Sequence, residues 1–265
     1  MRAISLATPT LPPATHTSAY LVGPDDGPGE LWIVDPATPY PDQQAVLRAA
    51  LDAEADAGRR VAGVLLTHHH GDHVGAATMV AAHTGAPIAA HPLTAARLAG
   101  RGIEVAWPLE DEAQVGPLTC VWTPGHAPGH LCFLDRATGA MIVGDMVAGV
   151  GTILVDPDDG DMTSYLASLA RMRALGPTAL LPAHGPMIGA AVAKLDEYVA
   201  HRLMREARVA AALGAPASIR ALVAIAYADT PAPLWPLAAR SLEAHLVKLE
   251  RDGRARRIGD DWALA

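Results

Sequence analysis

The 265-residue chain is poor in aromatic residues, in cysteine and in long apolar runs. It has one Phe and two Cys, and no apolar run approaches the ~20 residues of a membrane-spanning helix. Cys120 and Cys132 lie in apolar runs without CxxC spacing, so we expect two small buried hydrophobes rather than a disulfide. The N-terminus lacks a secretory hydrophobic core. These absences predict a cytoplasmic protein with no membrane partner. They also mean that Val, Leu, Ile and Ala must fill its core.

Two catalytic motifs are also absent, and basic residues are scarce in most of the chain. No G-x-S-x-G turn and no P-loop occur, so serine-hydrolase and nucleotide-hydrolase functions lose support. Residues 1–189 carry 9 Lys and Arg against 19 Asp and Glu, a net charge of −10. Residues 190–265 carry 11 against 9, or +2, which together give the −8 of the whole chain. An acidic body argues against broad binding of a phosphate backbone.

Histidine, in contrast, is concentrated at one point. The run Thr67-His68-His69-His70-Gly71-Asp72-His73 follows the apolar segment 61–66, which reads as a buried strand. Imidazole and carboxylate groups are the usual ligands of zinc and related divalent ions. Alternate side chains of an extended backbone point the same way, so His68 and His70 can converge on one ion. Asp72 and His73, one turn later, can then bind a second ion close by.

Three further metal-binding groups follow other apolar, strand-like segments. His126 follows the segment 118–123, Asp145 follows 140–144, and His184 follows 179–183. Loops at one end of a layered sheet bring such side chains together from distant parts of the sequence. The ordered set resembles the HxHxDH…H…D…H signature of the metallo-β-lactamase superfamily, and the resemblance covers about residues 1–190. The set consists of His68, His70, Asp72, His73, His126, Asp145 and His184.

The resemblance implies an αββα sandwich with two metal ions at one edge between its sheets. His68, His70 and His126 would hold the first ion, and Asp72, His73 and His184 the second. Asp145 would bridge the two ions together with a hydroxide, which would attack the substrate. Asp145 and Asp72 are therefore the expected catalytic carboxylates, with Asp72 also able to guide a proton to the leaving group. Zinc is the preferred metal, although iron and manganese tolerate mixed His and Asp ligands.

The last quarter of the chain has a different pattern. Three helical segments and a short basic hairpin resemble a winged-helix module like that of a lactamase-like subgroup, which includes a mitochondrial single-strand endoribonuclease. We therefore predict a catalytic domain at 1–190 and a helical, winged-helix-like domain at 191–265. The long helix could also serve in a homodimer. The predicted tail elements are helices at 192–213, 218–227 and 237–251, and a hairpin at 253–264.

In the catalytic domain, strands and helices alternate. The hairpin strands are expected at 19–22 and 31–34, a further strand at 87–90, and several strands between 115 and 143. Helices are expected at 42–57, 74–83, 93–98 and 165–175.

Three residues outside the ligand set have separate interpretations. Asp35 is either a hydrogen-bond partner of a metal-binding histidine or a turn-forming aspartate before proline, and the sequence leaves both open. His130 reads as a packing or hydrogen-bonding residue. Tyr165 is expected to anchor its helix rather than to reach the site.

The ligand set predicts a hydrolase of a small ester, thioester or lactone. The set resembles that of hydroxyacylglutathione hydrolases, lactonases and fungal polyketide thioesterases. The net negative charge of residues 1–189 also suits a small-molecule substrate with few phosphates. The alternative is a phosphodiesterase or single-strand endoribonuclease, with nucleic acid as the less favoured partner. That alternative depends on four basic residues of the hairpin region, namely Arg251, Arg254, Arg256 and Arg257. A non-catalytic scaffold is disfavoured because the whole ligand set is present.

Overall fold

Two mixed β-sheets contain the predicted strands of the catalytic domain. The computed structural model describes residues 1–265. The chain divides into two units. The first comprises residues 1–123, 129–152 and 176–191, and the second comprises 124–128, 153–175 and 192–265. The predicted domain boundary at 190/191 lies close to the last of these divisions, and as a functional boundary it stays a prediction.

The first sheet contains six strands. These are β1 (Arg2–Ala7), β2 (His16–Val22), β3 (Gly29–Val34), β4 (Arg59–Leu65), β5 (Ile88–Ala90) and β6 (Trp107–Pro108). They lie in the order β1-β2-β3-β4-β5-β6, with antiparallel pairing up to β3 and parallel pairing beyond it.

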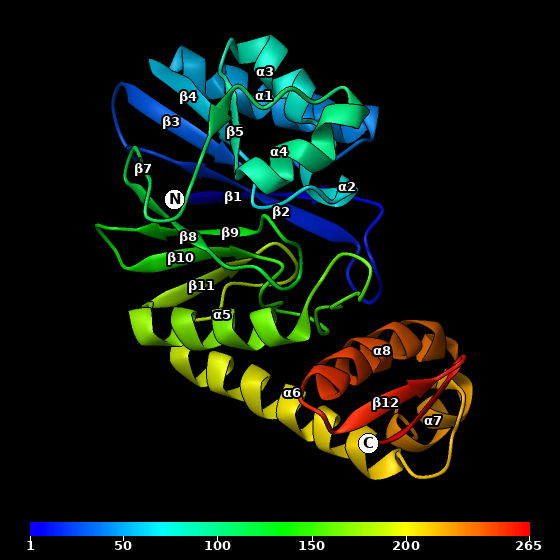
Figure 1. Cartoon of the computed structure of the whole chain (residues 1–265). Helices are drawn as coiled ribbons and strands as arrows, with labels where there is room; N and C mark the ends of the chain where they lie inside the picture. The colour runs from blue at the N-terminus through cyan, green and yellow to red at the C-terminus, as the bar shows by residue number, and fades with distance from the viewer. The chain divides into compact units, whose positions relative to one another are not determined.

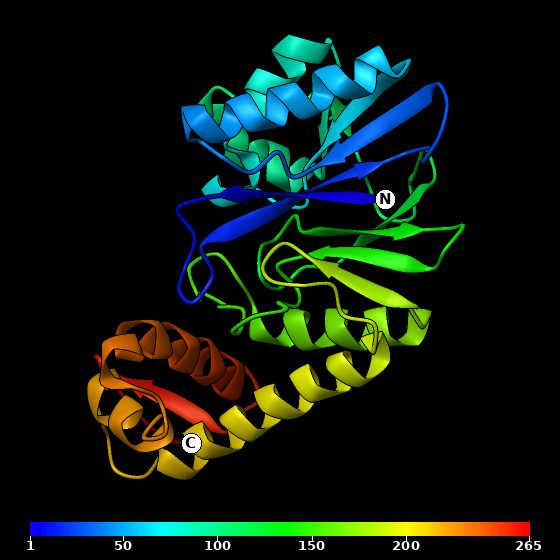
Figure 2. The ribbon, with the colours of Figure 1, turned by 180° about the vertical axis from the view of Figure 1, so that it is seen from behind.

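The helices of this unit are α1 (Pro41–Asp56), α2 (Gly71–Val74), α3 (Ala77–Thr84) and α4 (Pro92–Leu98), followed by a 3-10 turn at Ala99–Arg101. Helices α1, α3 and α4 lie along one face of the first sheet (Figures 1 and 2).

The second sheet contains five strands. These are β7 (Gln114–Val115), β8 (Leu118–Trp122), β9 (Leu131–Asp135), β10 (Ala140–Gly144) and β11 (Ala179–Pro182). Their order is β11-β10-β9-β8-β7, and only the β10–β11 pair is parallel. The sheet packs face to face with the first sheet, because one apolar core contains side chains from both.

The alternation of side chains along each strand builds two cores. On β2, Leu21 packs with the helices, whereas Tyr20 and Val22 point to the second sheet. From the second sheet, Phe133 and Ile142 enter the same space between the sheets. The order of layers in this unit is therefore helices, first sheet, second sheet. Side chains that follow the strand ends at one edge of the two sheets can then form a site.

Most predicted elements of this unit are confirmed, but two predictions are wrong or incomplete. The predicted helix at 74–83 is two helices, since Val74 ends α2 and α3 begins at Ala77. The helix is interrupted at Ala76, which has φ −109° and ψ +7°. Glycine precedes it because a Cβ on Gly75 would lie 2.6 Å from the backbone nitrogen of Pro39. The sequence does not predict strand β1, because its half-exposed side chains give only a weak pattern. Cys120 and Cys132 are both buried, as expected.

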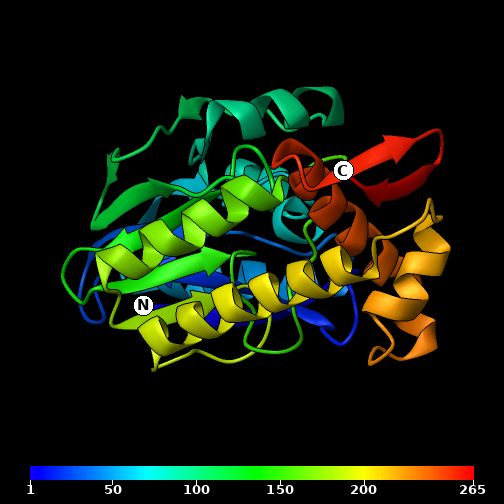
Figure 3. The ribbon, with the colours of Figure 1, turned by 60° about the horizontal axis from the view of Figure 1, so that its bottom comes forward.

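The second unit is mainly helical. Its elements are α5 (Met162–Leu175), α6 (Ala191–Ala212), α7 (Ile219–Ala226), a 3-10 turn at Ala232–Leu234, α8 (Trp235–Arg251), β12 (Ala255–Ile258) and β13 (Asp261–Leu264). The long helix α6 leads into α7 and α8, and the hairpin strands β12 and β13 pair antiparallel (Figure 3). The apolar core of this unit contains Leu222, Leu242, Leu246 and Trp262. All four predicted tail elements are thus confirmed.

No helix of the chain has the length and apolar character needed to cross a membrane.

The side chain of one buried histidine in the second unit makes no hydrogen bond. His245 on α8 is fully buried, and neither ring nitrogen has a hydrogen-bond partner. Burial, together with the cationic side chains of Arg202 and Lys248, lowers the pKa of His245 to about 3. The folded chain therefore holds this imidazole neutral, whereas the unfolded chain protonates it below the ordinary histidine pKa of about 6.5. Stability contributed by the neutral ring is lost as the pH falls through about 6.5.

We expect His245→Leu to be more stable than the wild type, and the difference to grow on acidification. A leucine of similar size removes two buried polar atoms that lack partners, which is worth about 1 kcal/mol. Between pH 7.5 and 5.5 the wild type should lose about 1.4 kcal/mol more than the variant through this one histidine. Urea unfolding at both pH values measures the difference. A variant that is less stable at both values, with an unchanged gap, would contradict the expectation.

Candidate metal centre

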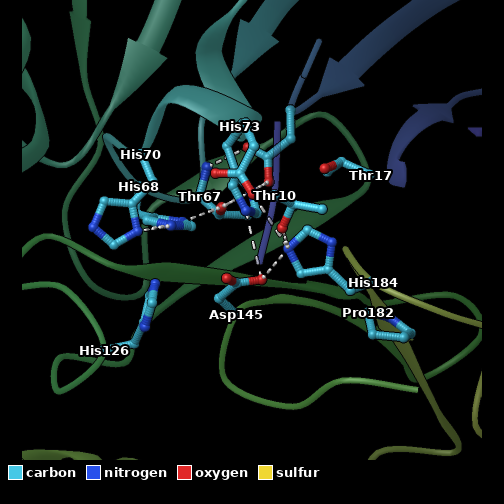
Figure 4. Close-up of polar contacts among 12 residues, drawn as sticks. Thr10, Thr17, Thr67, His68, His70, His73, His126, Asp145, Pro182 and His184 are labelled. Carbon is cyan, nitrogen blue, oxygen red and sulfur yellow. Dashed lines mark hydrogen bonds and ion pairs between the residues drawn. The ribbon is translucent and has the colours of Figure 1, made fainter. Parts of the chain in front are cut away.

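Six of the seven predicted ligands belong to the first unit, where they follow the ends of β4, β10 and β11. His68 and His70 lie just beyond β4, and Asp72 and His73 lie on the short helix α2. Asp145 follows β10 directly, and His184 follows β11 after one further residue. Both sheets therefore deliver ligands to the same edge, and His73, Asp145 and His184 point toward one another there (Figure 4).

The group predicted for the second ion is compact. The ligand atoms of Asp72, His73 and His184 all lie within 4.8 Å of one another. Asp145 Oδ1 lies 3.3 Å from His184 Nε2 and 3.5 Å from His73 Nε2. The ligand atoms of His68, His73 and Asp145 form a second group within the same 4.8 Å limit. Asp145 thus lies within 4.8 Å of His68 from the first predicted set and contacts His73 and His184 from the second, which is the position expected of a bridging carboxylate.

His68 and His70 meet as the alternation along an extended backbone requires. His68 Nε2 and His70 Nδ1 lie 2.9 Å apart, with the two rings nearly perpendicular. Two imidazole nitrogens at this separation can give their lone pairs to one cation once the proton between them is displaced. His126 belongs to the second unit, where its buried ring faces Leu154. Its role as the third ligand of this ion stays a prediction.

The hydrogen bonds of the histidines determine which nitrogen carries the proton. His184 Nδ1 lies 3.0 Å from the carbonyl oxygen of His16, and His126 Nδ1 lies 2.8 Å from that of Leu154. A carbonyl oxygen can only accept, so both Nδ1 atoms must donate. Each neutral ring then has its lone pair on Nε2, the atom that a metal ion would bind.

Asp35 and Thr67 determine in the same way which ring nitrogen of His68 and His73 carries the proton. Asp35 accepts hydrogen bonds from the backbone N–H and the hydroxyl of Thr67, at 2.8 and 2.7 Å. Its Oδ2 also accepts from His73 Nδ1 at 2.8 Å. Since the Thr67 hydroxyl has given its proton to Asp35, its oxygen accepts from His68 Nδ1 at 2.9 Å. One carboxylate therefore leaves the lone pairs of His68 and His73 on Nε2.

His130 orients Asp145 without belonging to the ligand set. Its Nε2 accepts from the backbone N–H of Asp145 at 3.2 Å, and its Nδ1 donates to the Thr123 hydroxyl at 2.9 Å. The neighbouring Gly144 has φ +46°, and a Cβ there would lie 2.6 Å from His130 Nε2. A glycine at this position lets the chain turn tightly against the histidine. The interpretation of His130 as a hydrogen-bonding residue is confirmed.

The charges at the site are strongly coupled. Burial alone would lower the pKa of His73, but three neighbouring carboxylates, led by Asp145, hold it well above its usual value. Burial would raise the pKa of Asp145, yet His73 and His184 outweigh it and keep that pKa well below its ordinary range. For His184, burial again acts to lower the pKa and Asp145 raises it. The site therefore stabilises an anionic Asp145 beside positive charge.

This arrangement fits divalent metal ions. His73 Nε2 is buried and makes no hydrogen bond, although the other nitrogen of the ring is fully used. Nε2 of His73 lies 3.5 Å from Asp145 and Nε2 of His184 lies 3.6 Å from Asp72, so two carboxylates would compensate a cation bound by these nitrogens. Neutral imidazole and carboxylate are also the ligand types that zinc, iron and manganese share. The residues present therefore suit a pair of such ions.

The sequence predicts a set of ligands but not all of the residues that hydrogen-bond to them. It assigns no role to Thr67, although the place of this residue between a strand and the first histidine could suggest one. For Asp35 it leaves two roles open, and the structure shows both a hydrogen-bond partner of histidine and an unusual backbone, with φ +50°. Tyr165 is fully buried on α5 with Arg202 over its ring, which agrees with an anchoring role.

Comparison with known proteins identifies the architecture. Residues 12–184 match the family model of the metallo-beta-lactamase superfamily, and residues 218–262 match the beta-lactamase associated winged helix domain. A metallo-beta-lactamase family protein from Thermus thermophilus has the same fold, with a TM-score of 0.81 and 22% sequence identity, covering 100% of this chain and 98% of that one. This likeness extends over both units and agrees with the predicted sandwich and winged-helix tail.

Two further proteins are similar over part of the chain. The lactamase-like protein vrtG of Penicillium aethiopicum is 34% identical over 205 residues, which cover 74% of this chain and 60% of that protein. The protein TTHA1623, solved in a di-iron-bound form, is 26% identical with a TM-score of 0.54, covering 72% of this chain and 96% of its own. From the matched family model and the convergent ligands, the chain belongs to the metallo-beta-lactamase superfamily.

Proposed function

We propose that the chain is a dinuclear metal-dependent hydrolase of a small ester, thioester or lactone. The observation that carries this proposal is the convergence of His73, His184 and Asp145, with hydrogen bonds that present Nε2 of each histidine to the same space. Such a constellation suits attack by an activated water on an electrophilic centre and needs no covalent enzyme intermediate.

The proposed ligand assignment follows the sequence prediction. His68, His70 and His126 would hold the first ion, and Asp72, His73 and His184 the second. Asp145 would be shared by both. In support of His126, its Nδ1–H donates to a carbonyl oxygen and leaves the lone pair on Nε2. Zinc is favoured, and iron or manganese would suit the same ligands.

Bound divalent ions would supply a Lewis acid and bring the pKa of a bound water toward about 7. The residues of the chain perform the other tasks. Asp145 is buried and its pKa is held well below its ordinary range, so its negative charge would reduce the repulsion between two bound cations. Asp72 is 16% exposed and is the more accessible of the two carboxylates. We propose that Asp72 also passes a proton to the leaving group.

Two observations support a small substrate rather than a nucleic acid. Residues 1–189 carry a net charge of −10, which would repel a polyphosphate chain. The four arginines that favour the alternative are largely engaged within the second unit. Arg251 pairs with Asp161 and Arg254 with Glu206, whereas the Nε atoms of Arg256 and Arg257 donate to carbonyl oxygens of the hairpin. The alternative, a phosphodiesterase or single-strand endoribonuclease, therefore has less support in the structure than in the sequence.

We expect metal-loaded protein to hydrolyse thioesters, lactones or esters at least about a hundredfold faster than phosphodiesters, given the charge of the catalytic part. The measurement is a hydrolysis panel of thioesters, lactones, simple esters, bis(4-nitrophenyl) phosphate and unstructured RNA. Protein stripped with a chelator and reloaded with zinc, iron or manganese provides the control for metal dependence. Metal-dependent cleavage of RNA without carbonyl hydrolysis would replace the proposed substrate class by the alternative.

Homodimer formation through α6 and a cytoplasmic location stay predictions from the sequence. Leu203 on α6 is 50% exposed, and Met204 beside it is 36% exposed. Sedimentation of the wild type and of a Leu203→Glu, Met204→Glu double variant would test the dimer, since two charges in an apolar interface would dissociate it.

A further inference from the structure

His126 is held by the same unit that contains the winged-helix elements. The segment 124–128 belongs to the second unit, together with the loop 153–161 and helices α5, α6 and α8. The Nδ1 atom of the His126 ring donates to the carbonyl oxygen of Leu154 over 2.8 Å. The direction of this ring therefore depends on where the loop places Leu154.

Arginines from two helices hold this loop. Arg202 on α6 is 2% exposed and donates to the carbonyl oxygen of Ile153, the residue before Leu154. Arg240 on α8 binds both oxygens of Asp156, with Nε to Oδ2 at 2.9 Å and Nη2 to Oδ1 at 2.5 Å. A bidentate pair of this kind fixes direction as well as distance. Arg240 also pairs with Asp158, so ion pairs hold the loop on the C-terminal side of Leu154 as well.

A second route reaches the residue next to His126. Arg251 at the end of α8 pairs with Asp161, whose backbone N–H donates to the carbonyl oxygen of Gly125 at 2.8 Å. Gly125 has φ +136°, and a Cβ there would lie 2.3 Å from the Cα of Tyr165 on α5. Only glycine allows this approach. The Ser168 hydroxyl of the same helix donates to the carbonyl oxygen of Pro124 at 2.7 Å.

We infer that Arg240 and Arg251 of α8 are positioning residues for His126, so that α8 sets how well the ring of His126 binds a metal ion. The inference rests on the proposed role of His126 as a ligand. Metal affinity is sensitive to such supporting contacts, because removing them typically weakens binding 10- to 100-fold.

The test compares metal binding by full-length wild type, Arg240→Gln, Arg251→Gln and the double variant. Zinc affinity is measured by competition with a chromophoric chelator, and cobalt-substituted protein reports each site through its visible absorption. We expect the wild type to bind two ions per chain. In the variants, the affinity of one ion should fall about 10- to 100-fold, with the larger loss in the double variant. The cobalt band that weakens should be the band that His126→Ala removes.

Matched controls separate positioning from general loss of structure. Arg173→Gln breaks an exposed pair with Asp196 in the same unit and should leave both affinities unchanged. Arg240→Lys keeps the charge but loses the bidentate contact, so it should recover affinity only in part. If the glutamine variants do not fold, Arg240→Lys decides the question. If every variant of Arg240 and Arg251 binds two ions with wild-type affinity, the inference is overturned and the proposed function remains intact. A wild type that binds no second ion would instead contradict the proposed function.

Discussion

Asp145→Asn should lower hydrolysis on the order of a thousandfold and remove at least one metal ion per chain. Asp145 Oδ1 lies within 3.5 Å of Nε2 of both His73 and His184. An amide keeps the size of the side chain but removes the charge. Without that charge, two nearby cations repel without compensation, and the electrostatic basis of the site is lost. Metal content after gel filtration and kcat on the best substrate of the panel measure the two effects.

The control for this variant is Asp52→Asn, which removes an exposed carboxylate of α1 that pairs with His83. It should keep two ions and full activity, because surface ion pairs contribute little. Unfolding midpoints of the metal-free proteins show whether Asp145→Asn still folds. An Asp145→Asn protein that retains two ions and near-normal turnover would show that this residue is not the shared ligand.

Much of the fold follows from patterns that depend on local sequence. The segment 61–66 is apolar throughout and lies between two layers, as the sequence indicates. Helix α1 has Leu47 and Leu51 on its buried side and ends next to Gly58, which has φ +78°. Strand β1 escapes prediction because its only fully buried residue is Leu6. Its place depends on pairing with β2, a contact that local pattern does not encode.

The His and Asp groups of the candidate site stand out in the sequence because their types and order are unusual, whereas the residues that hydrogen-bond to them are of ordinary types. A threonine such as Thr67 or an arginine such as Arg240 has many possible roles, and nothing in the sequence selects one. Thr67 acquires its role from Asp35, which lies 32 positions earlier. Arg240 acquires its role from Asp156, which lies 84 positions earlier. Only folding brings these partners together, so the sequence alone leaves them without a function.

The hairpin arginines are a case in which the structure adds information that the sequence pattern lacks. The four arginines between positions 251 and 257 read as a basic surface. In the structure, Glu206 is 6% exposed and accepts from Arg254, and Lys248 lies 3.0 Å from its other oxygen. A charge cluster therefore predicts a nucleic-acid surface only when its counter-charges are known.

Asp35→Asn should weaken metal binding 10- to 100-fold at the second site and lower stability as well. Asp35 accepts three hydrogen bonds, two from Thr67 and one from His73 Nδ1. An amide has one acceptor oxygen and one donor group, so at least one of these donors must lose its partner. If the amide nitrogen faces His73, Nδ1 must accept and the proton moves to Nε2. The ligand atom of His73 would then carry a proton that a metal ion has to displace.

The matched control is Asp135→Asn, because Asp135 is also buried and also accepts from a threonine, here the Thr138 hydroxyl at 2.6 Å. Both variants should unfold at lower urea concentration, since each breaks a buried hydrogen-bond group. Only Asp35→Asn should change metal affinity, and its zinc binding should become more dependent on pH because the proton on Nε2 competes with the ion. Equal zinc affinities in the two variants would mean that Asp35 supports the fold alone. The tautomers of His68 and His73 would then have to be set by other contacts, and the chain of hydrogen bonds from Asp35 through Thr67 would lose its proposed part in metal binding.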